Sequence, residues 1–166
     1  YGSDGAQYRP QTSPLVRIVQ HGSGTARDSG FTVYTPEGGV AEYGTLVDPG
    51  PREEGDGATL RAKFGGEEVP LSWGIKRVRD VAGNTRVYDY TGEATDADRV
   101  LVPVEQRLTQ IRYGANAQAG VEHSRQVRLV YEPIGQVLTQ LTNHPSTSVV
   151  SRGYVAGMGY QHTQVL

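Results

Sequence analysis

The stretch Leu71–Tyr90 constrains the fold most, because it reads as two β-strands joined by a short turn. β-Branched and aromatic residues, which favour strands, lie on both sides of the segment Asp80–Asn84. Within that segment, Gly83 suits a backbone position with positive φ, and Asn84 tolerates the same region. The stretch therefore predicts a β-hairpin around which the rest of the chain is arranged.

The alternation of side chains in this hairpin predicts one apolar face. Successive residues of a strand point to opposite faces, so every second residue shares a face. Val78 falls out of phase with the residues before it, which predicts a bulge near Arg77. We expect Trp73 to pack in the core of the central sheet. The predicted apolar face consists of Trp73 and Ile75 on the first strand, and Tyr88 and Tyr90 on the second.

The composition extends this interpretation to the whole chain. Among 166 residues there are 22 Gly and 9 Pro, which favours short strands with many turns. Tyr outnumbers Phe 10 to 2, as expected for a sheet with one solvent-exposed face. No window has a convincing helical period. We predict an all-β fold of antiparallel hairpins forming a sheet or sandwich, with essentially no long helix, over residues 1–166 as a single domain or a fragment of a larger β-protein.

Other strands follow from shorter alternating stretches, and a loop excursion is expected at 45–70. The alternation in Gln126–Glu132 is the cleanest in the chain, and it places Val127, Leu129 and Tyr131 inward. The further predicted strands are Pro14–Gln20, Phe31–Tyr34 paired with Val40–Tyr43, Ala58–Phe64 within the excursion, Glu105–Tyr113, and Val137–Leu141.

Three turns share a pattern that indicates an irregular internal repeat. The segments are Tyr34–Val40, Arg79–Thr85 and Tyr131–Val137, and each has Gly at the fourth loop position. A single hairpin loop often contains Gly, but three such loops together favour a repeated hairpin architecture. We therefore expect Gly38, Gly83 and Gly135 to be structural residues, and positive φ at Gly83 and Gly135.

No set of residues predicts catalysis or metal binding. The four histidines lie in separate loop-like stretches without ligand spacing, and Cys is absent, so we predict no metal and no cofactor. A triad of His21 with Asp28 and Ser29, and Ca²⁺ at Asp96 and Asp98, are weak alternatives. The net charge of −2 gives no reason to expect nucleic acid, and no apolar run is long enough to span a membrane.

The order of several motifs resembles the N-terminal region of the plasmid-virulence B (SpvB-type) family, which also begins the B component of insecticidal toxin complexes. The motifs are FTVYTPEGGVAEYG at Phe31–Gly44, the stretch Trp73–Tyr90, Ile111–Tyr113 and Val127–Glu132, with the best match over 31–135. The segment Tyr131–Gln136 also resembles one YD repeat of Rhs-type proteins. The chain departs from the family pattern at Gly74, which directly follows the Trp.

The resemblance implies a non-catalytic β-scaffold segment of a large, secreted or cell-surface bacterial toxin protein. In such proteins enzymatic activity lies in a separate C-terminal domain, so the resemblance implies no catalytic residue here. The implied partners are neighbouring β-modules of the same or a partner toxin chain, which together form a shell around the toxic domain. The chain begins at Tyr1, so we expect a fragment whose sequence carries no information on targeting.

The alternative is a stand-alone carbohydrate- or receptor-binding β-module on a bacterial surface, and an unrecognised hydrolase is a third hypothesis. A glycan-binding module would place several aromatic rings on one open face as stacking platforms. A shell segment would bury the same rings against neighbouring strands. The candidate rings are Tyr8, Trp73, Tyr88, Tyr113 and Tyr160.

Overall fold

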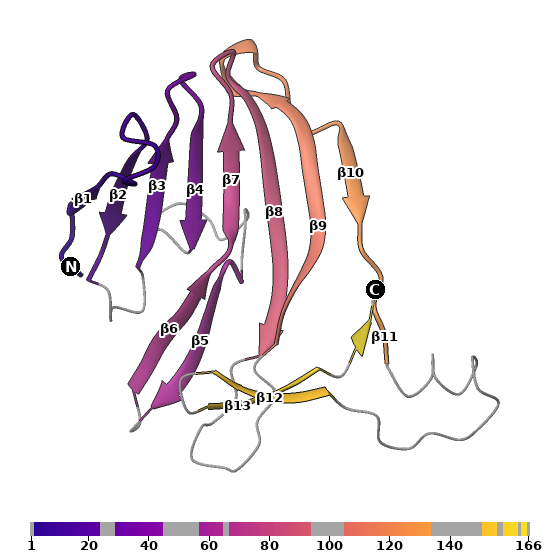
Figure 1. Cartoon of the computed structure of the whole chain (residues 1–166). Helices are drawn as coiled ribbons and strands as arrows, with labels where there is room; N and C mark the ends of the chain where they lie inside the picture. The colour runs from indigo at the N-terminus through magenta and orange to yellow at the C-terminus, as the bar shows by residue number, and fades with distance from the viewer. Residues whose placement is uncertain are drawn as a thin grey trace.

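A computed structural model describes residues 2–23, 29–44, 57–64, 67–93, 105–133, 151–155, 158–162 and 164–165. Its main feature is one antiparallel sheet of eight strands in the order β1-β2-β3-β4-β7-β8-β9-β10 (Figure 1). These strands are β1 (Gln7–Tyr8), β2 (Arg17–His21), β3 (Gly30–Tyr34), β4 (Val40–Gly44), β7 (Ile75–Arg79), β8 (Asn84–Glu93), β9 (Glu105–Asn116) and β10 (Arg125–Arg128).

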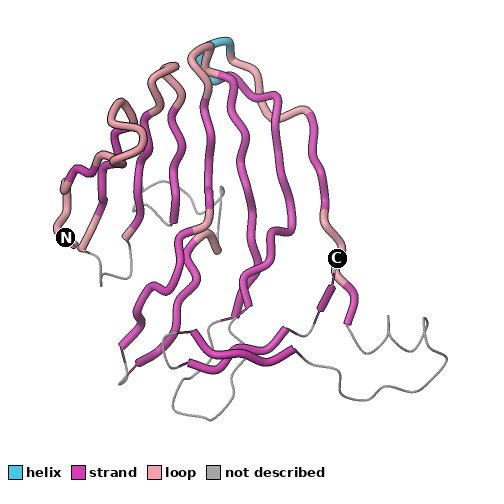
Figure 2. The backbone as a smooth tube through the Cα atoms, viewed as in Figure 1, coloured by secondary structure: helices cyan, strands magenta, loops and turns pink. Residues whose placement is uncertain are grey.

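Three smaller two-stranded ladders accompany the main sheet. They pair β5 (Thr59–Phe64) with β6 (Glu67–Trp73), β12 (Ser151–Val155) with β13 (Met158–His162), and β11 (Glu132–Pro133) with β14 (Gln164–Val165). Among the described residues the only helix is a single 3₁₀ turn, η1 (Ala117–Ala119), visible in Figure 2. The predicted all-β, antiparallel fold without a long helix is confirmed.

The central hairpin is present as β7 and β8, but its first strand is shorter than predicted. β6 ends at Trp73 and β7 begins at Ile75, so Trp73 pairs with Thr59 of β5 instead of joining the main sheet. The bulge expected near Arg77 is present: Glu42 opposes Arg77 while Tyr43 opposes Ile75, which leaves Lys76 as the extra residue.

Two of the three repeated turns are described, and they have the same hydrogen bonds. In the β3–β4 turn, the N–H of Thr35 donates to the carbonyl of Gly39, and the N–H of Gly38 donates to the carbonyl of Thr35. Asp80 and Gly83 make the equivalent pair of bonds in the β7–β8 turn. This pattern is a type I turn followed by a bulge residue in the left-handed region. Positive φ is confirmed at Gly83 (87°) and found at Gly38 (85°), whereas Gly135 and Val137–Leu141 lie outside the described residues.

The strand predicted over Gln126–Glu132 is only partly formed. β10 ends at Arg128, and Val127 is 47% exposed instead of inward. The physical reason is position: β10 is the outer strand, so one neighbour packs against it where a central strand has two. The strand predicted from Pro14 likewise begins only at Arg17, and Leu15 is 74% exposed.

The two faces of the main sheet differ in chemistry. One row across the sheet runs through Thr32, Glu42, Arg77, Val87 and Arg112, which are mostly polar. The adjacent row on the other face runs through Phe31, Tyr43 and Ile75, and continues on β8 and β9 with Tyr88 opposite Ile111. Buried apolar residues in the described part are few: Ala58, Val87 and Ala115.

Candidate functional site: an apolar sheet face

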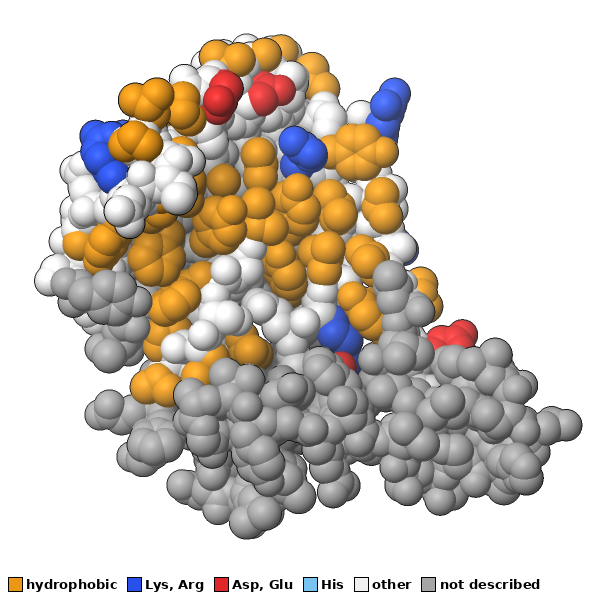
Figure 3. Space-filling model, viewed as in Figure 1, with side chains coloured by type: hydrophobic (Ala, Val, Ile, Leu, Met, Phe, Trp, Pro, Cys, Tyr) orange, Lys and Arg blue, Asp and Glu red, His pale blue; other side chains and the backbone are white. Residues whose placement is uncertain are grey.

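We call the apolar side of the main sheet the aromatic face. Its side chains come from alternate positions of five neighbouring strands, and Figure 3 shows hydrophobic side chains gathered over this side. All of them are half-buried. The aromatic face consists of Phe31 and Val33 on β3, Ala41 and Tyr43 on β4, Ile75 and Val78 on β7, Tyr88 and Tyr90 on β8, and Leu108 and Ile111 on β9.

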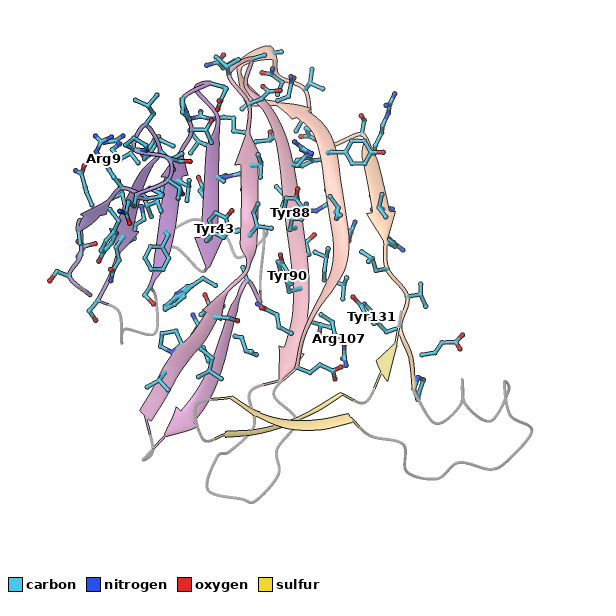
Figure 4. All side chains as sticks on the ribbon, viewed as in Figure 1. Arg9, Tyr43, Tyr88, Tyr90, Arg107 and Tyr131 are labelled. Atoms are coloured by element: carbon cyan, nitrogen blue, oxygen red, sulfur yellow. The ribbon has the colours of Figure 1, made fainter. Side chains whose placement is uncertain are left out.

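Three tyrosines mark the middle of the aromatic face. Tyr43, Tyr88 and Tyr90 lie on β4 and β8, as labelled in Figure 4. Burial raises the pKa of Tyr90, and the nearby phenols of Tyr88 and Tyr43 raise it further, against a hydrogen bond from the Ile75 backbone that lowers it. The three rings therefore form one cluster in a partly water-excluded place.

Gly74 makes room for this cluster. A Cβ added at Gly74 would lie 3.1 Å from the Cζ atom of Tyr90, closer than ordinary van der Waals contact. The backbone of Gly74 also joins two ladders, because its N–H donates to Ala58 and its carbonyl accepts from Gly44. The residue that departs from the SpvB-type pattern thus has a structural role beside the aromatic face.

Trp73 lies at the edge of the aromatic face, where β6 meets the main sheet. Its indole N–H donates to the carbonyl of Ser29 at 3.0 Å and lies 3.1 Å from the hydroxyl of the same residue. The ring packs edge-on against Phe31, with centroids 5.1 Å apart. A Cβ on Gly44 would collide with Cδ1 of Trp73. Trp73 therefore anchors β6 to β3 and β4, although it is half-buried where a core position was predicted.

Tyr131 closes the aromatic face on the β10 side. Its hydroxyl donates to the carbonyl of Leu108 at 2.9 Å, and the Arg107 guanidinium lies 5.8 Å from its ring centroid. Arg107 in turn forms an ion pair with Glu105 at 2.8 Å. The predicted inward direction of Tyr131 agrees with these contacts.

The opposite face of the sheet is built from paired charges. Arg77 binds Glu42 through two hydrogen bonds of 2.9 and 3.0 Å, and Arg112 binds Asp89 through two of 3.0 and 3.1 Å. Val87 lies between the two arginines and is fully buried. The Arg77–Glu42 pair depends on the bulge between β4 and β7, which the sequence pattern located only approximately, and neither pair was predicted.

A hollow of about 830 Å³ lies on this charged face beneath the β9–β10 connection. Arg77, Arg112 and Glu42 line it together with Arg79 and His123. Two of its polar side chains are engaged within the sheet, because the Thr85 hydroxyl donates to the carbonyl of Ala115 and Glu42 is paired with Arg77. Arg86 lies opposite Val78, so it is on the other face of the sheet from Arg77 and Arg79. The three arginines therefore do not form one basic surface.

The weak catalytic and metal alternatives are not assembled among the described residues. His21 lies 2.7 Å from the hydroxyl of Thr32, whereas the Ser29 hydroxyl is engaged by Trp73. Asp28, Asp96 and Asp98 lie outside the described residues. No group of three or more potential metal ligands occurs in the described part, and no described helix is long and apolar enough to cross a bilayer.

No protein-family model matches this sequence, and no match to a curated protein was found. Solved structures do match. The N-terminal domain of the effector protein SpvB from Salmonella typhimurium strain LT2 is 14% identical with a TM-score of 0.56, over 96% of this chain and 54% of that one. A chain of the Photorhabdus luminescens Tc holotoxin pore is 12% identical with a TM-score of 0.51, over 99% of this chain and 9% of that one.

A third match, in the TcdB2-TccC3-Cdc42 crystal structure, has 12% identity and a TM-score of 0.50, again over 99% of this chain and 9% of that one. The fold is therefore that of the SpvB N-terminal domain and of Tc toxin-complex chains, and the resemblance noted from the motifs is confirmed at the level of fold. The chain spans about half of the SpvB domain and about a tenth of each Tc chain.

Proposed function

We propose that this chain is a structural, non-catalytic β-scaffold segment of a large secreted or cell-surface toxin-complex or Rhs-like protein. In this role it helps to form the shell that houses a toxic C-terminal domain. The main support for the proposal is the aromatic face, a wide apolar surface of the main sheet, together with a fold shared with toxin-complex chains. The partners are neighbouring β-modules of the same or a partner toxin chain.

The hydrophobic effect favours covering the aromatic face with a second layer. Apolar area removed from water contributes roughly 25 cal/mol per Å², and monomers rarely expose contiguous apolar patches larger than a few hundred Å². The aromatic face has ten half-buried side chains in adjoining rows. A second layer packed on it would bury the parts of these side chains that remain exposed, as the inner faces of a β-sandwich do.

The comparison with SpvB supports a second layer from the same kind of protein. The matched part accounts for 54% of that chain, so a domain of this fold has nearly as much chain again. The charged face is less suited to this layer, because Arg77 and Arg112 at its centre are already paired with carboxylates. The aromatic face is therefore the side on which we place the neighbouring β-module.

The test is to place a charge on the aromatic face of the complete gene product. Tyr88→Glu introduces the charge at the middle of the face, and Thr91→Glu is a matched control on the same strand, at an exposed position. We expect Tyr88→Glu to expose the C-terminal domain to a protease that the unmodified protein resists, and Thr91→Glu to leave protection unchanged. Full protection in the Tyr88→Glu protein would refute the proposal.

A measurement on residues 1–166 alone separates assembly from folding. Tyr88 is half-buried in this chain and keeps part of its ring in water, so Tyr88→Glu should lower the melting temperature by a few degrees while the chain stays folded. A small shift in the isolated chain, combined with lost protection in the complete protein, places the defect at the interface.

The second candidate, a carbohydrate-binding module, is favoured by the exposed parts of the Tyr43, Tyr88 and Tyr90 rings on one open face. Isothermal titration of residues 1–166 with a panel of oligosaccharides tests it. Binding that Tyr88→Ala abolishes would support this candidate over the scaffold role.

A further inference from the structure

The two outer strands of the main sheet differ in how open they are. β1 has only two residues, and it is followed by Pro10, which has no N–H to donate. β10 has four residues, all of them exposed, and no described strand lies on its outer side (Figure 1). Among the described strands, the open edge of the main sheet is therefore β10.

The register of β10 shows which backbone groups point outward. The N–H of Leu129 donates to the carbonyl of Thr109 on β9. In an antiparallel pair the bonded residues alternate, so Val127 and Arg125 also point their backbone groups toward β9. The backbone N–H and carbonyl of Gln126, and those of Arg128, therefore point away from the sheet. These four groups have the geometry that an added strand requires.

The side chains of β10 define what that strand should carry. Arg125 and Arg128 are exposed, and neither forms an ion pair with a described residue. Val127 is 47% exposed and lies opposite Ile111, in the row that continues the aromatic face. Gln126 is engaged on the other face by a hydrogen bond from Gln110. The edge thus presents two cations, Arg125 and Arg128, with the apolar residue Val127 between them in sequence.

A second copy of this chain is a poor occupant. Because the outward-facing residues of two antiparallel β10 strands lie opposite each other, Arg128 of one copy would lie opposite Gln126 or Arg128 of the other, and the seam would hold four arginines with no carboxylate from β10. Like charges directly opposite each other destabilise a strand pair, whereas opposite charges stabilise it by about 0.2–1 kcal/mol. The same arginines that disfavour self-pairing favour a strand with carboxylates.

We propose that β10 accepts an added antiparallel strand with acidic residues opposite Arg125 and Arg128 and an apolar residue opposite Val127. The inference rests on the proposed function in taking a neighbouring β-module as the source of the strand. Read from its N-terminus, the added strand has the order acidic, apolar, polar, acidic. Backbone bonds to Gln126 and Arg128 supply affinity, and the charges fix register and partner choice.

The test is a tethered probe strand. A flexible Gly/Ser linker of about ten residues joins Leu166 to the segment Glu-Val-Thr-Glu, which raises the local probe concentration to about the millimolar range. A matched probe has Lys in place of both Glu residues. The readout is amide hydrogen exchange at Gln126 and Arg128, whose N–H groups become bonded only if a strand adds at this edge.

We expect the Glu probe to slow exchange at both amides at least tenfold, and the Lys probe to leave it unchanged. Arg125→Glu with Arg128→Glu should reverse the preference, so that only the Lys probe slows exchange. Arg79→Glu with Arg86→Glu alters the charge equally, away from the edge, and should leave the preference for the Glu probe intact. No slowing by the Glu probe, or equal slowing by both probes, would overturn the proposal.

The outcome is distinguishable from failure of the scaffold role. The protease experiment reports on burial of the aromatic face, whereas the probe experiment reports on the backbone of β10. The Glu probe could protect β10 although the complete protein does not shield a C-terminal domain from protease. That result would support β10 as a strand acceptor and would reject the shell role.

Discussion

Removing the Trp73 side chain should destabilise the chain by about 3–4 kcal/mol. A fully buried Trp truncated to Ala costs about 3–5 kcal/mol, and half burial reduces this packing contribution to about 2 kcal/mol. The lost indole N–H leaves the carbonyl and hydroxyl of Ser29, a fully buried residue, without that donor. This adds about 1–2 kcal/mol.

Trp73→Phe separates the two contributions. Phe retains most of the packing against Phe31 but cannot donate to Ser29, so we expect a cost of about 1–2 kcal/mol. The assay is urea unfolding of residues 1–166 followed by far-ultraviolet circular dichroism, because Trp73 is the only Trp and its fluorescence is lost in both variants. A cost below about 1 kcal/mol for Trp73→Ala, or equal costs for Ala and Phe, would refute this account of Trp73.

Three further predictions concern the turn glycine and two titrating groups. Gly83→Ala should destabilise the chain by about 1 kcal/mol in thermal melts, because φ is 87° there, and an unchanged melting temperature would contradict this. The Asn84 side chain and backbone hold the pKa of Asp80 below its ordinary value of 3.8. Ionised Asp80 therefore stabilises the fold fully above its ordinary pKa, and this stabilisation is lost as pH falls through the lower folded-state pKa. Asp80→Asn should flatten the acid side of the plot of stability against pH. An identical plot for the two proteins would count against this prediction. Burial raises the pKa of Tyr90 above its ordinary value of 10.0. The neutral Tyr90 phenol therefore contributes to stability below pH 10, and this contribution is lost as pH rises through the higher folded-state pKa. Ultraviolet titration should show one late phenol that Tyr90→Phe removes, and its persistence in the variant would assign it elsewhere.

Local patterns predicted the parts of this fold that depend on neighbours in sequence. The turn at Asp80–Asn84 was predictable because Gly at the left-handed position is a local requirement. The two-faced sheet was predictable because alternation over Phe31–Tyr34 and Tyr88–Tyr90 has a period of two residues.

The features that were missed depend on contacts between distant segments. Trp73 and Ser29 are 44 residues apart, and nothing in either local pattern indicates that one donates to the other. The pairing of Arg77 with Glu42 requires the bulge to fall at one particular residue, since a slip of one position would reverse the faces. Alternation in Gln126–Glu132 predicted a strand correctly in part, but it carries no information on whether a second layer covers Val127.

The central claim is that the aromatic face is covered in the intact protein. Hydroxyl-radical footprinting of Tyr43 and Tyr88 tests it most directly, with residues 1–166 and the complete gene product compared under the same dose. We expect measurable oxidation of both rings in residues 1–166, where each is only half-buried, and strong protection in the complete protein. Equal oxidation of Tyr43 and Tyr88 in the two samples would contradict it.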